Sequence, residues 1–78
     1  MAGMGPKPPR EFKLNWQPSE LPGEEFADIR GRGRFTIRST DDGQVVLRHN
    51  GSIIGYFSLP DIAKAEAQRR VPGILRGQ

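Results

Sequence analysis

The residues best suited to chemistry in this chain of 78 residues are arginines between positions 30 and 48. The segment 30–34 reads RGRGR, and two further arginines follow on apolar-rich segments. Guanidinium groups bind phosphate oxygens and can donate two hydrogen bonds to guanine in a DNA groove. The pattern therefore predicts nucleic-acid binding through Arg30, Arg32, Arg34, Arg38 and Arg48. The alternative is that the RGRG residues form a flexible, solubilising linker.

Residues for catalysis or metal binding are scarce. His49 is the only histidine, the chain has no cysteine, and His49 lies beside a turn, where we expect a structural role. Asp41 and Asp42 are adjacent carboxylates, but an Asp-Asp-Gly turn explains them because aspartate bonds to local backbone amides there. Gly31 and Gly33 lack the third glycine of a dinucleotide-binding loop. We predict no enzyme activity, no catalytic residue, no metal site and no cofactor.

Charge is distributed unevenly along the chain. Residues 1–29 carry three basic and five acidic groups, and residues 30–78 carry nine basic and four acidic groups. The net charges of −2 and +5 favour an acidic partner for the second part, such as nucleic acid. No apolar run is long enough to span a membrane or to form a signal peptide. We therefore expect a soluble cytoplasmic protein with no membrane partner and no small-molecule substrate.

Residues 33–71 predict an α+β fold, a three-stranded antiparallel β-meander packed against one C-terminal helix. Three apolar segments, GRFTIRS, QVVLRH and SIIGYFS, are separated by the turn signals TDDG and NG. Asn50-Gly51 suits a two-residue type I′ turn, and Gly43 suits the left-handed position of a three-residue loop. Ser58 is the expected helix cap with Asp61 three residues later, and Pro72-Gly73 is the expected helix end.

The turns also predict which side chains share a face of the sheet. Arg38 should lie opposite Val46, and Leu47 opposite Ile54. The expected core layer consists of Phe35, Ile37, Val45, Leu47, Ile54 and Tyr56. The expected outer face consists of Arg34, Thr36, Arg38, Gln44, Val46, Arg48, Ile53 and Phe57. On the helix, the residues expected to face the sheet are Leu59, Ile62, Ala63, Ala67 and Val71.

Residues 1–29 are expected to form an extended or partly disordered arm, and residues 30–78 a small β-β-β-α domain. Within the arm, Phe12, Leu14 and Trp16 alternate with polar residues, which is typical of a short strand with one apolar face. These three residues either fold back and complete the core, which would add an N-terminal strand to the meander, or dock onto another protein. We favour folding back, because a domain of about 49 residues is close to the lower limit for independent folding.

The segment from GRFTIRS to the helix resembles three-stranded-sheet-plus-helix modules of the AP2 type and the arm-binding domains of tyrosine integrases. The helix start that carries the resemblance is Gly55-Tyr56-Phe57-Ser58 followed by Ala63. The resemblance implies DNA binding through the sheet face, on Arg34, Arg38 and Arg48. The chain is also similar to small bacteriophage proteins, some of which bind a host protein.

Two functions from different classes follow. The first is a non-enzymatic DNA-binding protein that uses the arginine face. The alternative is a protein–protein interaction factor that uses Phe12, Leu14, Trp16 and Ile53, with a host protein, a virion protein or a second copy as its partner.

Overall fold

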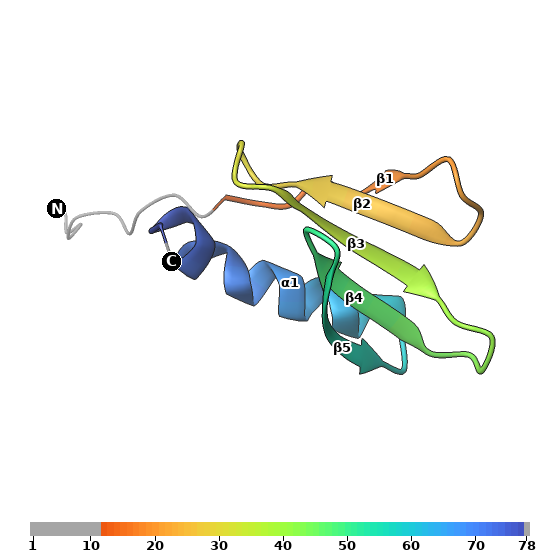
Figure 1. Cartoon of the computed structure of the whole chain (residues 1–78). Helices are drawn as coiled ribbons and strands as arrows, with labels where there is room; N and C mark the ends of the chain where they lie inside the picture. The colour runs from red at the N-terminus through yellow and green to blue at the C-terminus, as the bar shows by residue number, and fades with distance from the viewer. Residues whose placement is uncertain (1–11, 78) are drawn as a thin grey trace, which may run out of the picture.

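The computed structural model describes residues 12–77, which form one antiparallel sheet and one helix (Figure 1). The elements in chain order are β1 (Gln17–Pro18), β2 (Glu24–Asp28), β3 (Arg34–Ser39), β4 (Val45–His49), β5 (Ser52–Phe57) and α1 (Pro60–Leu75). Each strand pairs with the next, so the spatial order is β1-β2-β3-β4-β5. The expected α+β class is confirmed, but the expected three-stranded meander is a five-stranded one. The additional strands lie in the segment interpreted as an arm, whose first eleven residues lie outside the described part.

The hairpin between β3 and β4 has the predicted register. Arg38 lies opposite Val46, and Ile37 lies opposite Leu47. Gly43 has a φ of 85°, the left-handed conformation that the three-residue loop requires. The next turn, between β4 and β5, has φ values of 52° at Asn50 and 87° at Gly51, as a type I′ turn requires.

A β-bulge in β5 reverses the predicted faces at its end. Arg48 pairs with Ile53 as expected, but Leu47 pairs with Gly55 instead of Ile54. One extra residue on the bulged strand shifts all later side chains to the other face. The predicted positions of Tyr56 in the core and Phe57 outside are therefore wrong. Tyr56 is 56% exposed, and Phe57 packs against the core.

The helix differs from its predicted limits at both ends. Leu59, and not Ser58, is the N-cap residue, and no side chain caps the helix. Pro72 does not end the helix, which continues to Leu75. Because Pro72 lies in the last turn, its missing N–H removes only one backbone hydrogen bond, and Arg76 N–H still bonds to its carbonyl oxygen at 3.1 Å.

One side of α1 packs on the sheet. Ala63, Ala67 and Val71 recur every four residues and are buried, as predicted. Leu59 and Ile62 are 56% and 46% exposed, so their predicted place against the sheet is wrong. The core cluster consists of Ile29, Phe35, Ile37, Val45, Leu47, Ala63, Ala67 and Val71.

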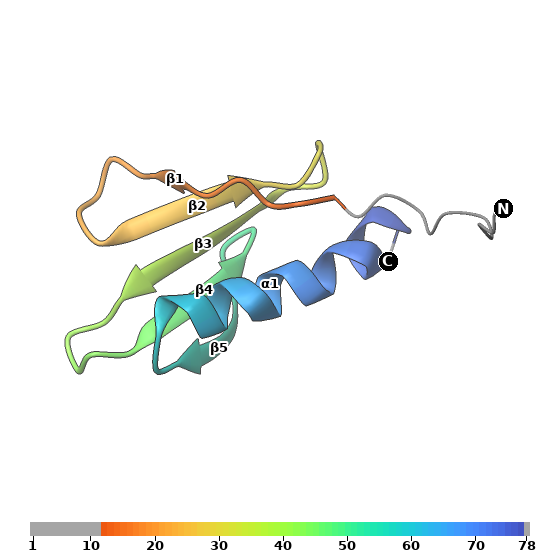
Figure 2. The ribbon, with the colours of Figure 1, turned by 180° about the vertical axis from the view of Figure 1, so that it is seen from behind.

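Residues 12–16 run beside α1 and complete the cover of the core (Figure 2). Phe12, Leu14 and Trp16 are half-buried and pack against the core cluster, as the fold-back alternative predicts. Gln68 holds this segment at two points. Its Nε2 donates to the Phe12 carbonyl oxygen at 2.6 Å, and its Oε1 accepts from the Leu14 N–H at 3.0 Å.

The RGRG segment forms a tight turn between β2 and β3, and not a flexible linker. Arg30 and Gly31 have φ values of 42° and 78°, and Ile29 N–H donates to the Gly33 carbonyl oxygen at 2.8 Å. Asn50 from the neighbouring hairpin bonds to both backbone groups of Arg34. The two turns are therefore fixed to each other at one end of the sheet.

Replacing Gln68 tests the attachment of residues 12–16. Gln68→Ala removes both hydrogen bonds and should lower the free energy of unfolding by about 1–2 kcal/mol. Urea denaturation measures this change. The matched control is Arg69→Ala on the neighbouring exposed position, which should cost less than about 0.5 kcal/mol. Equal losses for the two variants would contradict the attachment.

Replacing each of two glycines by alanine should change the free energy of unfolding in opposite directions. Gly33 has a φ of 112°, and a Cβ there would collide with the Asn50 side chain, so Gly33→Ala should cost at least about 1–3 kcal/mol. A Cβ at Gly73, inside α1, would meet no atom within 4 Å, so Gly73→Ala should add about 0.5–1 kcal/mol. Thermal unfolding of both variants checks the signs, and a stabilised Gly33→Ala protein would contradict the described turn.

Candidate nucleic-acid interface

The sheet has one face turned away from α1, here called the open face. Side chains alternate along a strand, so Arg34, Thr36 and Arg38 of β3 share a side. Thr36 lies opposite Arg48 of β4, which places Arg48 on that same side. The three arginines predicted on matching strands are thus brought to one face by the register.

Strand β2 adds acidic residues to the open face that the sequence analysis did not place there. Its register sets Glu24 opposite Arg38, and Asp28 opposite Arg34. Arg34 Nε bonds to Asp28 Oδ1 at 2.8 Å, and its guanidinium carbon lies 4.1 Å from the centre of the Phe26 ring. Arg34 is therefore held in place by a carboxylate and an aromatic ring. Both side chains of the ion pair are more than half exposed, so the pair itself adds little stability.

Arg38 and Arg48 differ from Arg34, because within residues 12–77 neither forms an ion pair. Together with Val46, with Ser39 at the end of β3 and with the loop residues Thr40 and Asp41, they line a shallow groove of about 260 Å³. Val46 belongs to the open face yet is only 4% exposed. Its register partners are Arg38 and Tyr56, so their side chains shield it while their polar ends remain in solvent.

Tyr56 and Ile53 complete this part of the open face. Tyr56 lies opposite Val46, and Ile53 lies opposite Arg48. Ile53 is 50% exposed, similar to Tyr56. The register of the Asn50-Gly51 turn predicts Ile53 on this face but not Tyr56, because the turn alone does not reveal the bulge. The signal that could have shown it is Gly55, since a glycine inside a strand often marks a bulge.

Arg30 and Arg32 are not brought together with the open-face arginines. They lie in the turn between β2 and β3, where Arg30 is 5.6 Å from the centre of the Phe12 ring. Arg32 lies close to Gly77, just after the end of α1. These two arginines therefore lie near the C-terminal end of α1 and not on the open face.

The residues proposed for protein binding are also divided. Trp16 lies beside Lys64, whose Nζ is 5.7 Å from the Trp16 ring centre and 2.9 Å from Glu25 Oε1. Trp16, Phe12 and Leu14 pack on the inner side, whereas Ile53 alone lies on the open face.

The Asp42 carboxyl lies in the turn between β3 and β4, where a neighbouring hydroxyl contacts it. The Thr40 hydroxyl donates to the Asp42 carboxylate and lowers the pKa of that group, which favours its ionised form in the turn. In the described residues, no group of three or more histidine and carboxylate side chains is placed to hold a metal ion. The helix of residues 60–75 does not meet the length and hydropathy needed to cross a membrane.

Comparison with known proteins finds no matching family model, no matching curated protein and no matching solved structure.

Proposed function

We propose that this chain is a non-enzymatic DNA-binding protein and that DNA contacts the half of the open face formed by β3, β4 and β5. The observation that carries the proposal is the placement of Arg38 and Arg48 beside the exposed Tyr56. In the described part of the chain, these two guanidinium groups form no ion pair, and α1 lies on the other face. A cytoplasmic location and a bacteriophage origin stay predictions.

The two kinds of side chain suit different parts of a nucleic acid. Arg38 and Arg48 would neutralise phosphates, and Tyr56 offers a ring on which a base can stack. Stacking needs an accessible base, so single-stranded DNA should bind at least as tightly as duplex. Glu24 and Asp28 on β2 repel phosphates, which favours a path over the β3–β5 half of the face.

Salt dependence tests the arginine contacts. Fluorescence anisotropy of a labelled single strand, measured over a series of salt concentrations, gives the slope of log affinity against log salt. Each of Arg38→Gln and Arg48→Gln should weaken binding and reduce this slope by about 0.7, because one phosphate contact is lost. Glutamine retains part of the side chain that shields Val46, which limits damage to the fold.

Lys13→Gln is the matched control, since it removes the same charge from an exposed residue outside the open face. It should leave the slope within error. Asp28→Asn removes a negative charge from the open face and should therefore increase the affinity for DNA at low salt. Absent binding at low salt, or the same loss for Lys13→Gln as for Arg38→Gln, would contradict the proposal.

A second candidate is protein binding at the β5 edge. Strand β5 ends the sheet order and contains neither a charged residue nor proline, whereas the opposite edge, β1, has only two residues and includes Pro18. Unprotected edges are where a further strand can pair. The large apolar side chains exposed around this edge are Ile53, Tyr56, Leu59 and Ile62.

Self-association at this edge is measurable by sedimentation velocity at low and high protein concentration. If β5 pairs with a second copy, the wild-type protein dimerises as concentration rises, and Ile62→Lys remains monomeric. Leu21→Lys is the control, because Leu21 is 50% exposed, close to the 46% of Ile62, but follows β1 in the loop at the other side of the sheet. A wild-type protein that is monomeric at all concentrations would exclude a second copy as the partner.

A further inference from the structure

A groove of about 690 Å³ lies between the β4–β5 hairpin and the C-terminal half of α1. It is separate from the Arg38–Arg48 groove of the open face, with which it shares no lining residue. Its size falls within the range of about 300–1,000 Å³ that is common for small-molecule sites. The charged residues in its wall are Arg69, Arg70 and Arg76, and its apolar wall includes Ile54 and Ile74.

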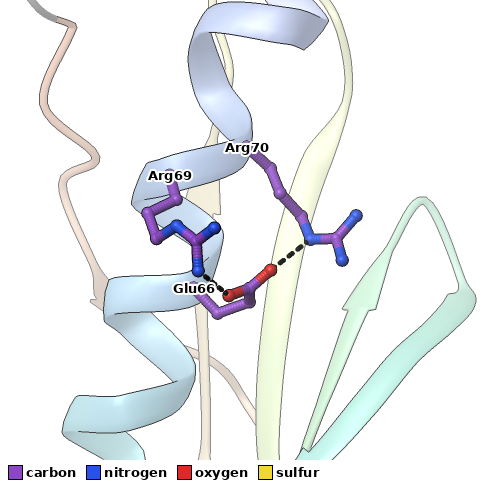
Figure 3. A network of polar contacts seen from close by, with 3 residues as sticks. All are labelled: Glu66, Arg69 and Arg70. Atoms are coloured by element: carbon purple, nitrogen blue, oxygen red, sulfur yellow. Dashed lines mark hydrogen bonds and ion pairs between the residues drawn. The ribbon is translucent and has the colours of Figure 1, made fainter.

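Glu66 fixes two of these arginines. Its Oε1 accepts from Arg69 Nη1 at 3.1 Å, and its Oε2 accepts from Arg70 Nε at 2.9 Å (Figure 3). Figure 3 shows the Arg70 guanidinium extending away from α1, with its two terminal nitrogens beyond the bond to Glu66. Each arginine therefore keeps further N–H donors free of Glu66. With Arg76, the cluster has three positive charges and one negative charge.

His49 adds a polar atom that the fold itself does not satisfy. Its ring forms a wall of the groove and lies 5.2 Å from the centre of the Phe35 ring. His49 Nε2 is buried and has no hydrogen-bond partner among the described residues. A buried ring nitrogen without a partner carries a free-energy cost, because its lost hydration is not replaced. Because the His49 ring lines the groove, a ligand bound there changes the surroundings of this nitrogen.

We infer that this groove binds a phosphate monoester, with the phosphate on the arginine cluster and the esterified group against the apolar wall and His49. A phosphate monoester carries nearly two negative charges at neutral pH and several acceptor oxygens, which match the net charge of +2 and the free N–H donors. The inference does not rest on DNA binding by the open face. A free nucleotide and the 5′-phosphorylated end of a strand are two sources of the same chemistry.

Because His49 is the only histidine in the sequence, its side-chain resonances can be assigned without ambiguity. Full-length protein is titrated with adenosine 5′-monophosphate, with adenosine and with inorganic phosphate, while the side-chain proton–nitrogen resonances of His49 are followed. The nucleotide should shift the Nε2 resonance in a saturable manner, inorganic phosphate should do so more weakly, and adenosine should not. Arg70→Gln and Arg76→Gln should each weaken nucleotide binding by about tenfold, because a charge-assisted hydrogen bond is lost.

Lys13→Gln is the matched control, since it removes one positive charge from an exposed residue that lines neither groove and should leave nucleotide binding at His49 unchanged. Thermal unfolding of each variant confirms that it is folded. Oligonucleotides with and without a 5′-phosphate distinguish the sources: a shift of His49 at lower concentration for the phosphorylated strand identifies a strand end. An unmoved His49 resonance at saturating nucleotide, an equal shift with adenosine, or equal losses for Lys13→Gln and Arg70→Gln would overturn the inference. If Arg38→Gln loses DNA binding while the nucleotide still shifts His49, the result bears on the open face and not on this groove.

Discussion

The need to cover the inner face of a five-stranded sheet with a single helix determines much of this structure. Helix α1 contacts β3, β4 and β5, which leaves the β1–β2 side of that face without helical cover. Residues 12–16 fill this space with Phe12, Leu14 and Trp16, and Gln68 fixes them through backbone hydrogen bonds. Lys64 adds an ion pair from the helix to Glu25 of β2. The fold therefore depends on an extended segment that has no regular secondary structure of its own.

Local sequence signals predicted the parts of the fold that depend on local geometry. The Asp-Asp-Gly and Asn-Gly turns fix the register of three strands near each turn, because φ is positive at Gly43, Asn50 and Gly51. The bulge was not predictable from these turns, since it depends on how Ile54 and Phe57 pack against the core. Strand β2 was missed because its acidic residues resemble a connector, although Ala27 and Ile29 alternate inward and are fully buried. The arginine face was predictable and its acidic border was not.

Carboxylates position arginines on both candidate surfaces. Asp28 holds Arg34 at the border of the open face, and Glu66 holds Arg69 and Arg70 beside the groove. In each case, further arginines lie nearby without an acidic partner in the described residues. An arginine that is already oriented loses less side-chain entropy when an anion binds. The acidic groups thus reduce the net charge but prepare the geometry of the basic groups around them.

The bonds from Gln68 to residues 12–16 also have a consequence for the order of folding. All strand pairs of the meander join neighbours in the chain, and such local contacts favour rapid assembly. The bonds of Gln68 join positions 54 and 56 residues apart, and closing so large a loop is entropically costly before the sheet exists. We therefore expect these bonds to form late in folding and to slow unfolding more than they accelerate folding. Residues 12–16 are thus expected to influence the rate at which the folded sheet opens more than the rate at which it assembles.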